Sequence, residues 1–459
     1  MREHLARRAA DELQRGLGRR TFFRAAAGVA AAGAVTTTGA GAAAAAASAA
    51  SAGAQHSSKG GRPGFHGTVL QPGRGPIPGD HYLPSEVDSV LWGYVPSVDA
   101  EPSLRMRSGQ TVTIDAVSHE GILEDQGRDP VEFFAGQGVP RSRVLDDAVE
   151  IARDYDRTER DFDRDGPHVV TGPVFVEEAR PGDVLKIETL RADLRVPYGV
   201  VSSRHGKGAL PLTAGGPAAG ITLDEVMPPV GADGRPTGDP ESYGNVSVFT
   251  PVEKGHGVMG GGRVRFPLRP FMGMMGVAHQ QGAGPTDDLL NSIPPTLGGG
   301  NIDIRHLGVG STFYLPVRAD GALFYVGDPH MAMGDGEVAL TAMEGSLRGT
   351  FRLTVCRAGD GDAPSVAHHY PFAETAEHWI PIGLSDPDGA GGGEQNSDLD
   401  VAMRRAVVNA LDFLEHDKGM ERAVAYAYLS AAADFAISQV VDRTVGVHGL
   451  IRKADLGRS

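Results

Sequence analysis

The sequence predicts a mainly β protein, built as packed sheets or as a distorted β-barrel or sandwich, with a small C-terminal α-helical region. Among the 459 residues, 64 are glycine and 31 are proline, which is typical of a β protein rich in turns. From Thr68 to Val355, short runs alternate apolar and polar residues, and Gly, Pro or Asp bounds each run. After Gly393 the pattern changes to longer amphipathic segments, which indicate helices.

The first 58 residues resemble an export signal and linker rather than a folded domain. Arg19 and Arg20 precede two phenylalanines and a weakly apolar Ala/Gly run, the layout of a twin-arginine signal. Small residues at 52–54 offer a cleavage site before Gln55. The alternative is a low-complexity alanine tract after a basic helix. We expect a periplasmic or extracellular protein with no stable membrane span after removal of the signal.

Residues 59–388 are expected to form the β-rich catalytic region. Period-two alternation predicts strands at 110–117, 172–194, 311–317, 322–328, 337–347 and 349–355. Within the second of these stretches, Pro181 and Gly182 supply the dihedral angles of a strand–turn–strand connection.

Helices are predicted at 139–156, 398–419 and 420–441. The last two make up the C-terminal helical region, 389–459, which we expect to pack on the same catalytic unit. The glycine-rich segment 389–395 is expected to be a flexible loop that joins this region to the strands.

Charge and cysteine content exclude several classes of partner. The formal net charge is −15, and no block of Lys or Arg follows the signal, so neither nucleic acid nor an anionic membrane is expected to bind. Cys356 is the single cysteine, so no internal disulfide can form. The twin-arginine route carries folded proteins, which is compatible with a metal acquired before export.

Familiar motifs give weak signals. The segment 161–168, DFDRDGPH, begins like a calcium loop, but Gly172 stands where the bidentate Glu belongs, which favours an Asx-rich turn. The glycine-rich segment 257–264 does not link a strand to a helix in a βαβ unit, so it does not predict dinucleotide binding. The sequence contains no Walker A motif and no G-x-S-x-G elbow.

Four histidines lie in glycine-rich loops at the ends of predicted strands: His119, His205, His279 and His330. A lone loop histidine is commonly just a hydrogen-bonding residue. Four of them beside carboxylates favour a divalent metal held by imidazole and carboxylate ligands with one open position. Such an ion lowers the pKa of its bound water from about 16 toward about 7, which suits hydrolysis. A nearby carboxylate can then move protons.

Three stretches together resemble the acetamidase/formamidase family: 168–190, 299–345 and 427–451. The resemblance extends from about Val87 to Ile451, and the middle stretch is long and specific. It implies a β-rich homo-oligomer that uses a divalent metal, zinc, to hydrolyse short aliphatic amides to carboxylate and ammonia. This chain departs from many members at 331–333, Met-Ala-Met, and it carries the predicted export signal, both of which concern the choice of substrate.

The family's patterns identify candidate catalytic and metal-binding residues. The pattern G-N-x-D falls on Asn301 and Asp303, and G-D-x-H-x-x-x-G-D-G-E falls on Asp328, His330, Asp335 and Glu337. We expect His119 and His330 to bind the metal together with Asp303, with Asp335 as the alternative carboxylate. Glu337 is expected to act as general base and then acid, and Asp335 belongs to the same catalytic group. Asn301 or backbone N–H groups are expected to stabilise the oxyanion.

Substrate contacts are expected from His205, Lys207 and His279. An alternative for Asp335-Gly336-Glu337 is a simple hairpin turn, because Asp-Gly favours such turns. Two other functions stay open at this stage: hydrolysis of another linear or cyclic C–N compound, and binding without turnover by an exported protein on the same scaffold.

Overall fold

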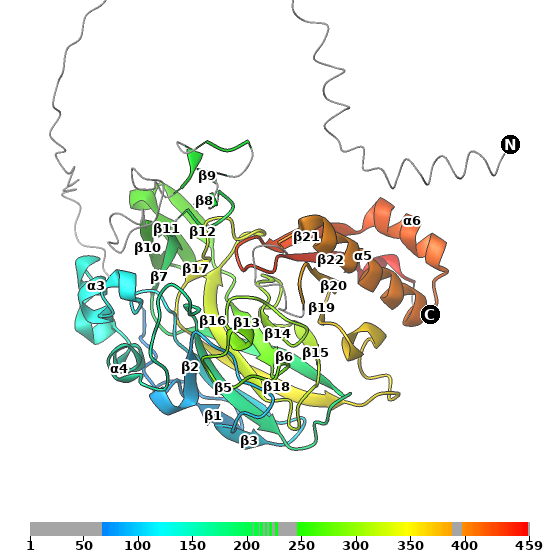
Figure 1. Cartoon of the computed structure of the whole chain (residues 1–459), viewed down its shortest axis with the longest axis horizontal. Helices are drawn as coiled ribbons and strands as arrows, with labels where there is room; N and C mark the ends of the chain where they lie inside the picture. Colours follow the sequence, from blue (N-terminus) through cyan, green and yellow to red (C-terminus); the bar gives the residue numbers. More distant parts are fainter. Residues whose placement is uncertain are drawn as a thin grey trace, which may run out of the picture. The chain divides into compact units, whose positions relative to one another are not determined.

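Two large β-sheets form the centre of the computed structural model (Figure 1). The structure describes residues 67–204, 206–210, 212–213, 216–217, 220–222, 225–227, 246–387 and 397–457. The predicted export signal and the loop 389–395 lie outside these residues, so both stay predictions.

The first sheet contains nine strands within the described residues. In spatial order they are β1 (His81–Leu83), β4 (Thr111–Ala116), β18 (Leu347–Cys356), β6 (Val184–Leu194), β15 (Thr312–Pro316), β19 (Phe372–Glu374), β20 (His378–Leu384), β22 (Gly446–Arg452) and β21 (Asp434–Gln439). All neighbours are antiparallel except β1 and β4.

The second sheet contains eleven strands of the described chain. Its main path is β12 (Val264–Pro267), β11 (His256–Met259), β10 (Val246–Glu253), β7 (Tyr198–Ser203), β17 (Met343–Glu344), β16 (Phe324–Ala332), β13 (Phe271–Val277) and β14 (Gly299–Asn301). Strand β5 (Val169–Val176) pairs with β16 and also with β2 (Val90–Trp92) and β3 (Leu104–Met106). A separate small pair consists of β8 (Leu212–Thr213) and β9 (Gly216–Pro217).

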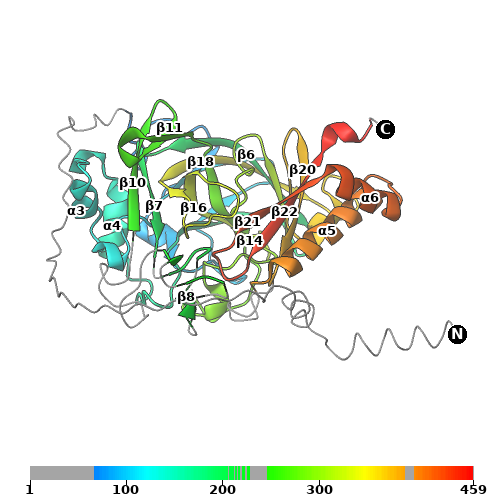
Figure 2. The ribbon, with the colours of Figure 1, turned by 90° about the horizontal axis from the view of Figure 1, so that it is seen from above.

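Four α-helices of the described residues lie at the two ends of this β unit. Helices α3 (Pro130–Gly136) and α4 (Asp146–Asp154) lie opposite α5 (Leu399–His416) and α6 (Arg422–Ala432) in both views (Figures 1 and 2). Short 3-10 helices occur at Val87–Ser89, Glu124–Gln126, Arg141–Arg143, Gly260–Gly262, Asp288–Leu290, Ser365–His368 and Lys453–Asp455. Among the described helices, none combines the length and the apolar character that crossing a membrane requires.

The main hydrophobic core joins the two sheets. Phe324 of β16 packs edge-on against Phe351 of β18, with ring centroids 5.7 Å apart, so the aromatic contact crosses from one sheet to the other. Strands β13 and β16 are buried along almost their whole length, so neither strand has a polar face exposed to solvent. Because these strands are closely packed and shielded from water, they hold their side chains in fixed positions.

A buried ion pair fixes β4, the strand that leads into His119. Arg348 of β18 binds both carboxylate oxygens of Asp115, at 2.6 and 2.9 Å, and neither side chain is exposed. This bidentate geometry locks the register of β4 against β18. The loop that follows β4 therefore starts from a well-defined position.

The predicted fold class is confirmed, whereas some element boundaries were wrong. The expected helix 420–441 ends at Ala432, because the next residues add a strand, β21, to the edge that β22 offers. Only Met343–Glu344 and Leu347 of the expected strand 337–347 are in strands. The expected helix 139–156 is confined to Asp146–Asp154 and follows a short 3-10 turn after Pro140.

Candidate functional site

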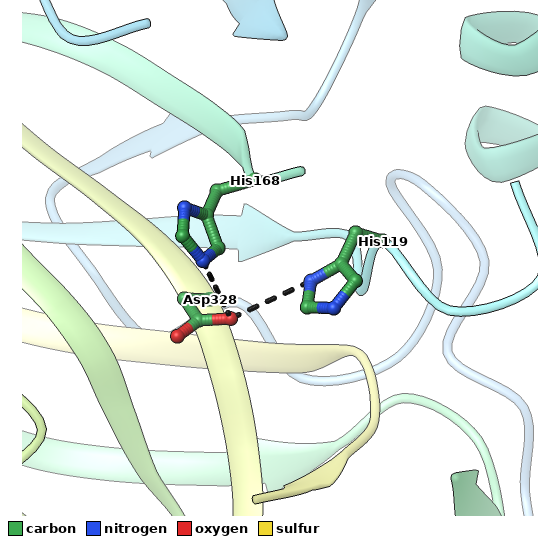
Figure 3. Close-up of side chains that lie close together, drawn as sticks. All are labelled: His119, His168 and Asp328. Atoms are coloured by element: carbon green, nitrogen blue, oxygen red, sulfur yellow. Dashed lines mark ion pairs between the residues drawn. The ribbon is translucent and has the colours of Figure 1, made fainter. Parts of the chain in front are cut away.

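Two histidines and one aspartate that are far apart in the sequence converge between the sheets. His119 follows β4, His168 directly precedes β5, and Asp328 lies within β16 (Figure 3). Asp328 Oδ1 is 3.6 Å from His119 Nδ1 and 3.7 Å from His168 Nε2. All three side chains are buried. They offer two imidazole nitrogens and one carboxylate oxygen around one point.

Neighbouring side chains orient the two imidazole rings. His168 Nδ1 forms a 2.9 Å hydrogen bond with Ser292 Oγ, which leaves Nε2 directed at Asp328. On the far side of His119, Nε2 lies 3.6 Å from Glu120 Oε1. Arg204 donates to the same carboxylate oxygen at 2.8 Å and so holds Glu120 in place. Such outer partners are typical of imidazoles that bind metals.

A second group of acidic side chains surrounds His330, which is fully buried in β16. Its Nε2 lies 2.9 Å from Asp328 Oδ2, 3.1 Å from Glu344 Oε1 and 3.8 Å from Glu337 Oε1. Its Nδ1 lies 3.7 Å from Asp303 Oδ1. Asp328 therefore links the His119–His168 pair to this acidic group.

The electrostatics of the site favour a bound cation. Burial and the nearby Asp303 carboxyl raise the pKa of Glu337 well above its usual value. Burial and the Asp442 carboxyl do the same to Asp303, because several carboxyl groups are crowded together away from water. Burial lowers the pKa of His168 to about 4, so this imidazole is neutral and able to bind a metal.

Unsatisfied polar atoms support the same interpretation. Within the described residues, His119 Nδ1, His330 Nδ1 and Asp328 Oδ1 are buried without a hydrogen-bond partner. Buried polar atoms are normally satisfied, and a ligand is one explanation where they are not. The donor set, imidazole nitrogen with carboxylate oxygen, suits Zn²⁺ and related ions.

Backbone strain is concentrated in this site. Asp303, Asp328 and Glu337 adopt φ angles of 47°, 49° and 46°, in the left-handed region that non-glycine residues rarely occupy. The surrounding structure therefore imposes the conformations of three acidic residues of one cluster, a feature that is common at functional sites.

Gly273 of β13 is required for the close approach of these acids. A methyl group on it would lie 2.5 Å from Asp303 Oδ1 and His330 Cε1, and 2.8 Å from Asp328 Oδ2. We expect Gly273→Ala to destabilise the protein by about 1–3 kcal/mol, because the added carbon overpacks the cluster. We also expect it to lower kcat/KM by at least about 10-fold, since displaced catalytic groups lose alignment. Thermal unfolding and steady-state kinetics measure the two effects.

Gly136→Ala is the matched control for this variant. A methyl group at the end of α3 meets no atom within 4 Å, so stability and activity should stay close to wild type. Equal unfolding temperatures and equal kcat/KM for the two variants would contradict the assigned role of Gly273.

A cavity of about 790 Å³ opens onto both groups. Its described lining includes His119, His168, Asn301, Asp328, Glu337, Glu344 and Asp442. Asn301 donates from Nδ2 to Ile293 O at 3.1 Å, whereas its buried Oδ1 has no hydrogen-bond partner among the described residues. An acceptor in this position suits an N–H of a bound ligand.

Most of the residues predicted to bind metal or to act in catalysis come together, but Asp335 does not join them. His119, His330, Asp303, Glu337 and Asn301 surround Asp328 or line the cavity beside it. Asp335 instead pairs with Arg305 at 2.8 Å, and its side chain is 27% exposed.

The three residues predicted to contact the substrate differ in their positions relative to the cavity. Lys207 lines the cavity. His279 lies just beyond β13 and is not part of the described lining. His205 lies outside the described residues, so its role stays a prediction.

Sequence reasoning missed His168, Glu344 and Asp442. The sequence places His168 at the end of an expected Asx-rich turn, and 161–168 does form such a turn, with Asp161 accepting from Asp163 N. The available signal was its position directly before a strand, like that of the other histidines at strand ends. The period-two pattern assigns Glu344 to the expected strand 337–347, and Asp442 lies just past the expected helix 420–441.

Comparison with known proteins identifies relatives of this chain. A model of the Acetamidase/Formamidase family matches residues 286–448, which include the acidic group around His330. The formamidase of Methylophilus methylotrophus is 30% identical over 131 residues, 27% of this chain and 31% of the relative. The acetamidase of Mycolicibacterium smegmatis is 40% identical over 52 residues, 11% of this chain and 13% of the relative. The alignments thus span less than a third of these relatives' lengths.

Two solved structures share the fold. The acetamidase of Yersinia enterocolitica superposes with a TM-score of 0.60 at 22% identity, over 85% of this chain and 96% of that one. The acetamidase of Bacillus halodurans gives a TM-score of 0.56 at 24% identity, over 82% of this chain and 100% of that one. Residues 286–448 thus match the Acetamidase/Formamidase family model, and the chain shares the fold of these two acetamidases.

Proposed function

We propose that this protein is a metal-dependent amidase, which hydrolyses short aliphatic amides to a carboxylate and ammonia. The observation that carries the proposal is the convergence of His119 Nδ1, His168 Nε2 and Asp328 Oδ1 beside a cavity that Glu337 also lines. The names of the relatives, formamidase and acetamidase, support amides as substrates.

His119, His168 and Asp328 would hold the metal, with His330 and Asp303 next to them as further donors. When bound there, a divalent ion such as Zn²⁺ supplies Lewis acidity and activates water at neutral pH. The unpartnered buried atoms and the surplus of carboxylates both fit such an ion. His330 and Asp303, the ligands expected from the sequence, stay in the proposal because each lies within the same linked cluster.

Glu337 moves protons in the proposed reaction. Its carboxyl is buried, lines the cavity and lies 3.8 Å from His330 Nε2. Because an amide nitrogen must leave protonated, a carboxyl group with a raised pKa is suited to delivering that proton after it has accepted one. Asn301 is suited to accepting an N–H of the substrate amide at Oδ1, since its Nδ2 is used by Ile293 O. This role differs from the oxyanion contact expected from the sequence.

Ammonia release tests the proposal. The full chain is expected to release ammonia from formamide, acetamide or propionamide, and removal of metal by a chelator should abolish this activity, because the activated nucleophile is lost. Adding Zn²⁺ back should restore it. Activity that is unchanged after chelation, with metal removal verified by elemental analysis, would exclude a metal mechanism. A complete lack of turnover with any amide would instead favour the binding protein.

The size of the cavity favours a second candidate, hydrolysis of a larger linear or cyclic amide. Pockets of about 300–1,000 Å³ accommodate drug-sized ligands, whereas acetamide has four heavy atoms. At about 790 Å³, the described cavity falls within that range. Phe162 and Leu340 contribute apolar lining, which suits a substrate with a hydrocarbon portion. A panel of amides of increasing length, compared by kcat/KM, distinguishes the two candidates.

A further inference from the structure

A separate cluster of metal-ligand side chains includes Asp335, two residues before Glu337 in the same loop. It consists of His306, Asp335 and His448, and one ligand atom from each lies within 4.8 Å of the other two. The rings of His306 and His448 are 5.5 Å apart between centroids and meet edge to face. None of the three residues belongs to the group around Asp328.

Three different elements bring this cluster together. His448 lies in the middle of β22, where it pairs with Ile382 of β20 and Ala436 of β21. His306 lies in the turn after β14. Asp335 lies in the loop after β16, and the N–H of the adjacent Gly336 donates to Ser438 O at 3.0 Å. The cluster therefore connects both sheets of the described unit.

The two imidazoles present matching free nitrogens. His448 Nδ1 forms a 2.9 Å hydrogen bond with Ser438 Oγ, so Nε2 is the nitrogen left for a ligand. Both His448 Nε2 and His306 Nε2 are buried and without a hydrogen-bond partner among the described residues. His448 is not exposed at all. An orphaned, fully buried imidazole nitrogen is costly unless something binds it.

Electrostatics allow a cation to bind here. Arg305 pairs with Asp335 Oδ2 at 2.8 Å and leaves the other carboxylate oxygen available. The positive charge of Arg305 weakens cation binding, whereas the Asp335 carboxylate strengthens it.

We propose that His306 Nε2, His448 Nε2 and the Asp335 carboxylate form a second metal site for Zn²⁺ or a similar transition-metal ion. Two imidazoles and one carboxylate are a common ligand set for such ions. Donors around a tetrahedral ion with bonds of about 2.1 Å lie about 3.4 Å apart, so binding draws the three side chains slightly inward. Asp335 is partly exposed in a loop and is the ligand that moves.

The site would connect the loop that carries Asp335 and Glu337 to strands β21 and β22. Asp335 and Glu337 are two residues apart, while His448 belongs to the nine-stranded sheet. A metal bound at Asp335 adds a crosslink beside the existing hydrogen bond from Gly336 to Ser438. Its role is structural: it stabilises the folded state increasingly as the metal concentration rises, because ions that bind only the native protein stabilise it by mass action.

Zinc stoichiometry of the full chain tests the proposal. After equilibrium dialysis against buffered free Zn²⁺, His448→Gln and His306→Gln are each expected to hold about one Zn²⁺ fewer per chain than wild type. Substituting Co²⁺ should give a visible ligand-field absorption band that loses one component in the same variants. His256→Gln, which removes an exposed imidazole from β11, is the matched control and should retain the wild-type count. Equal zinc counts for wild type and both variants would overturn the proposal.

The test is independent of the amidase proposal. Asp328→Asn should remove the ion from the first site. The double variant with His306→Gln should then lose about two zinc ions per chain, because the two ligand sets share no residue. If Asp328→Asn loses zinc but His306→Gln does not, the second site is refuted while the amidase proposal stands. Should His448→Gln fail to fold, as judged by circular dichroism, the half-buried His306 provides the decisive variant.

Discussion

Glu337→Gln is expected to lower kcat for ammonia release by about 10²–10⁴-fold while leaving bound metal unchanged. The substitution keeps the shape of the side chain but removes the group that accepts and delivers protons, and general acid–base catalysis contributes about this factor. Glu337 is held in a strained conformation beside the cavity, with a φ of 46°, so the amide should occupy the same place. Steady-state kinetics and elemental analysis of the same preparation measure both quantities.

The metal content of the variant decides whether the Glu337 carboxylate is a metal ligand or a general base. If Glu337→Gln loses metal and activity together, Glu337 is a metal ligand. Near-normal turnover in this variant would show that Glu337 is not the general base. The matched control is Glu253→Gln on β10, an exposed residue paired with Arg265, which should change neither quantity. Substrate KM is expected to change little in Glu337→Gln, because the lost interaction acts mainly in the transition state.

Asp328→Asn is expected to weaken metal binding by more than about 100-fold and to lower activity in proportion at limiting metal. Within the described residues, Asp328 is the carboxylate that lies within 4 Å of His119, His168 and His330 together. Loss of an outer partner alone costs about 10–100-fold in metal affinity, so loss of a carboxylate that bridges the imidazoles should cost more. Competition with a chromogenic chelator measures the affinity.

An excess of Zn²⁺ should partly restore activity in Asp328→Asn, since the defect lies in binding rather than in proton transfer. The control is Asp320→Asn, whose side chain is 70% exposed in a turn and which should bind metal as wild type does. Unchanged affinity in Asp328→Asn would show that the His119–His168–Asp328 group does not hold the catalytic metal.

The strands of the core could be predicted from the sequence because their alternation and their turn residues are local signals. Strands β4, β15 and β18 lie where period-two patterns indicated them, and α5 lies between its expected ends at 398 and 419. The segment that forms β21 follows an alanine-rich helix without a glycine or proline between them, so no local signal marks the change. Its conformation depends on pairing with β22, which is a tertiary contact.

The candidate site could be predicted only in part, for a similar reason. His330 and Glu337 belong to one short motif, and Asp303 belongs to a second, so the resemblance to a family located them. His168 and Asp442 belong to no motif that marks them as ligands; they reach the site because β5 pairs with β16 and because Gln439 holds the turn 439–442. Only the paired strands bring these distant residues together.

Strand β21 has a consequence for how the protein becomes active. It accepts the N–H of Gly336, and the turn that follows it delivers Asp442 to the cavity, so segments about 100 residues apart must meet before the acids are in place. A chain still emerging from the ribosome cannot complete this arrangement until the segment that contains β21 and Asp442 has been made. The proposed activity therefore depends on β21, and fraying of β21 and β22 is expected to abolish it before the rest of the protein melts.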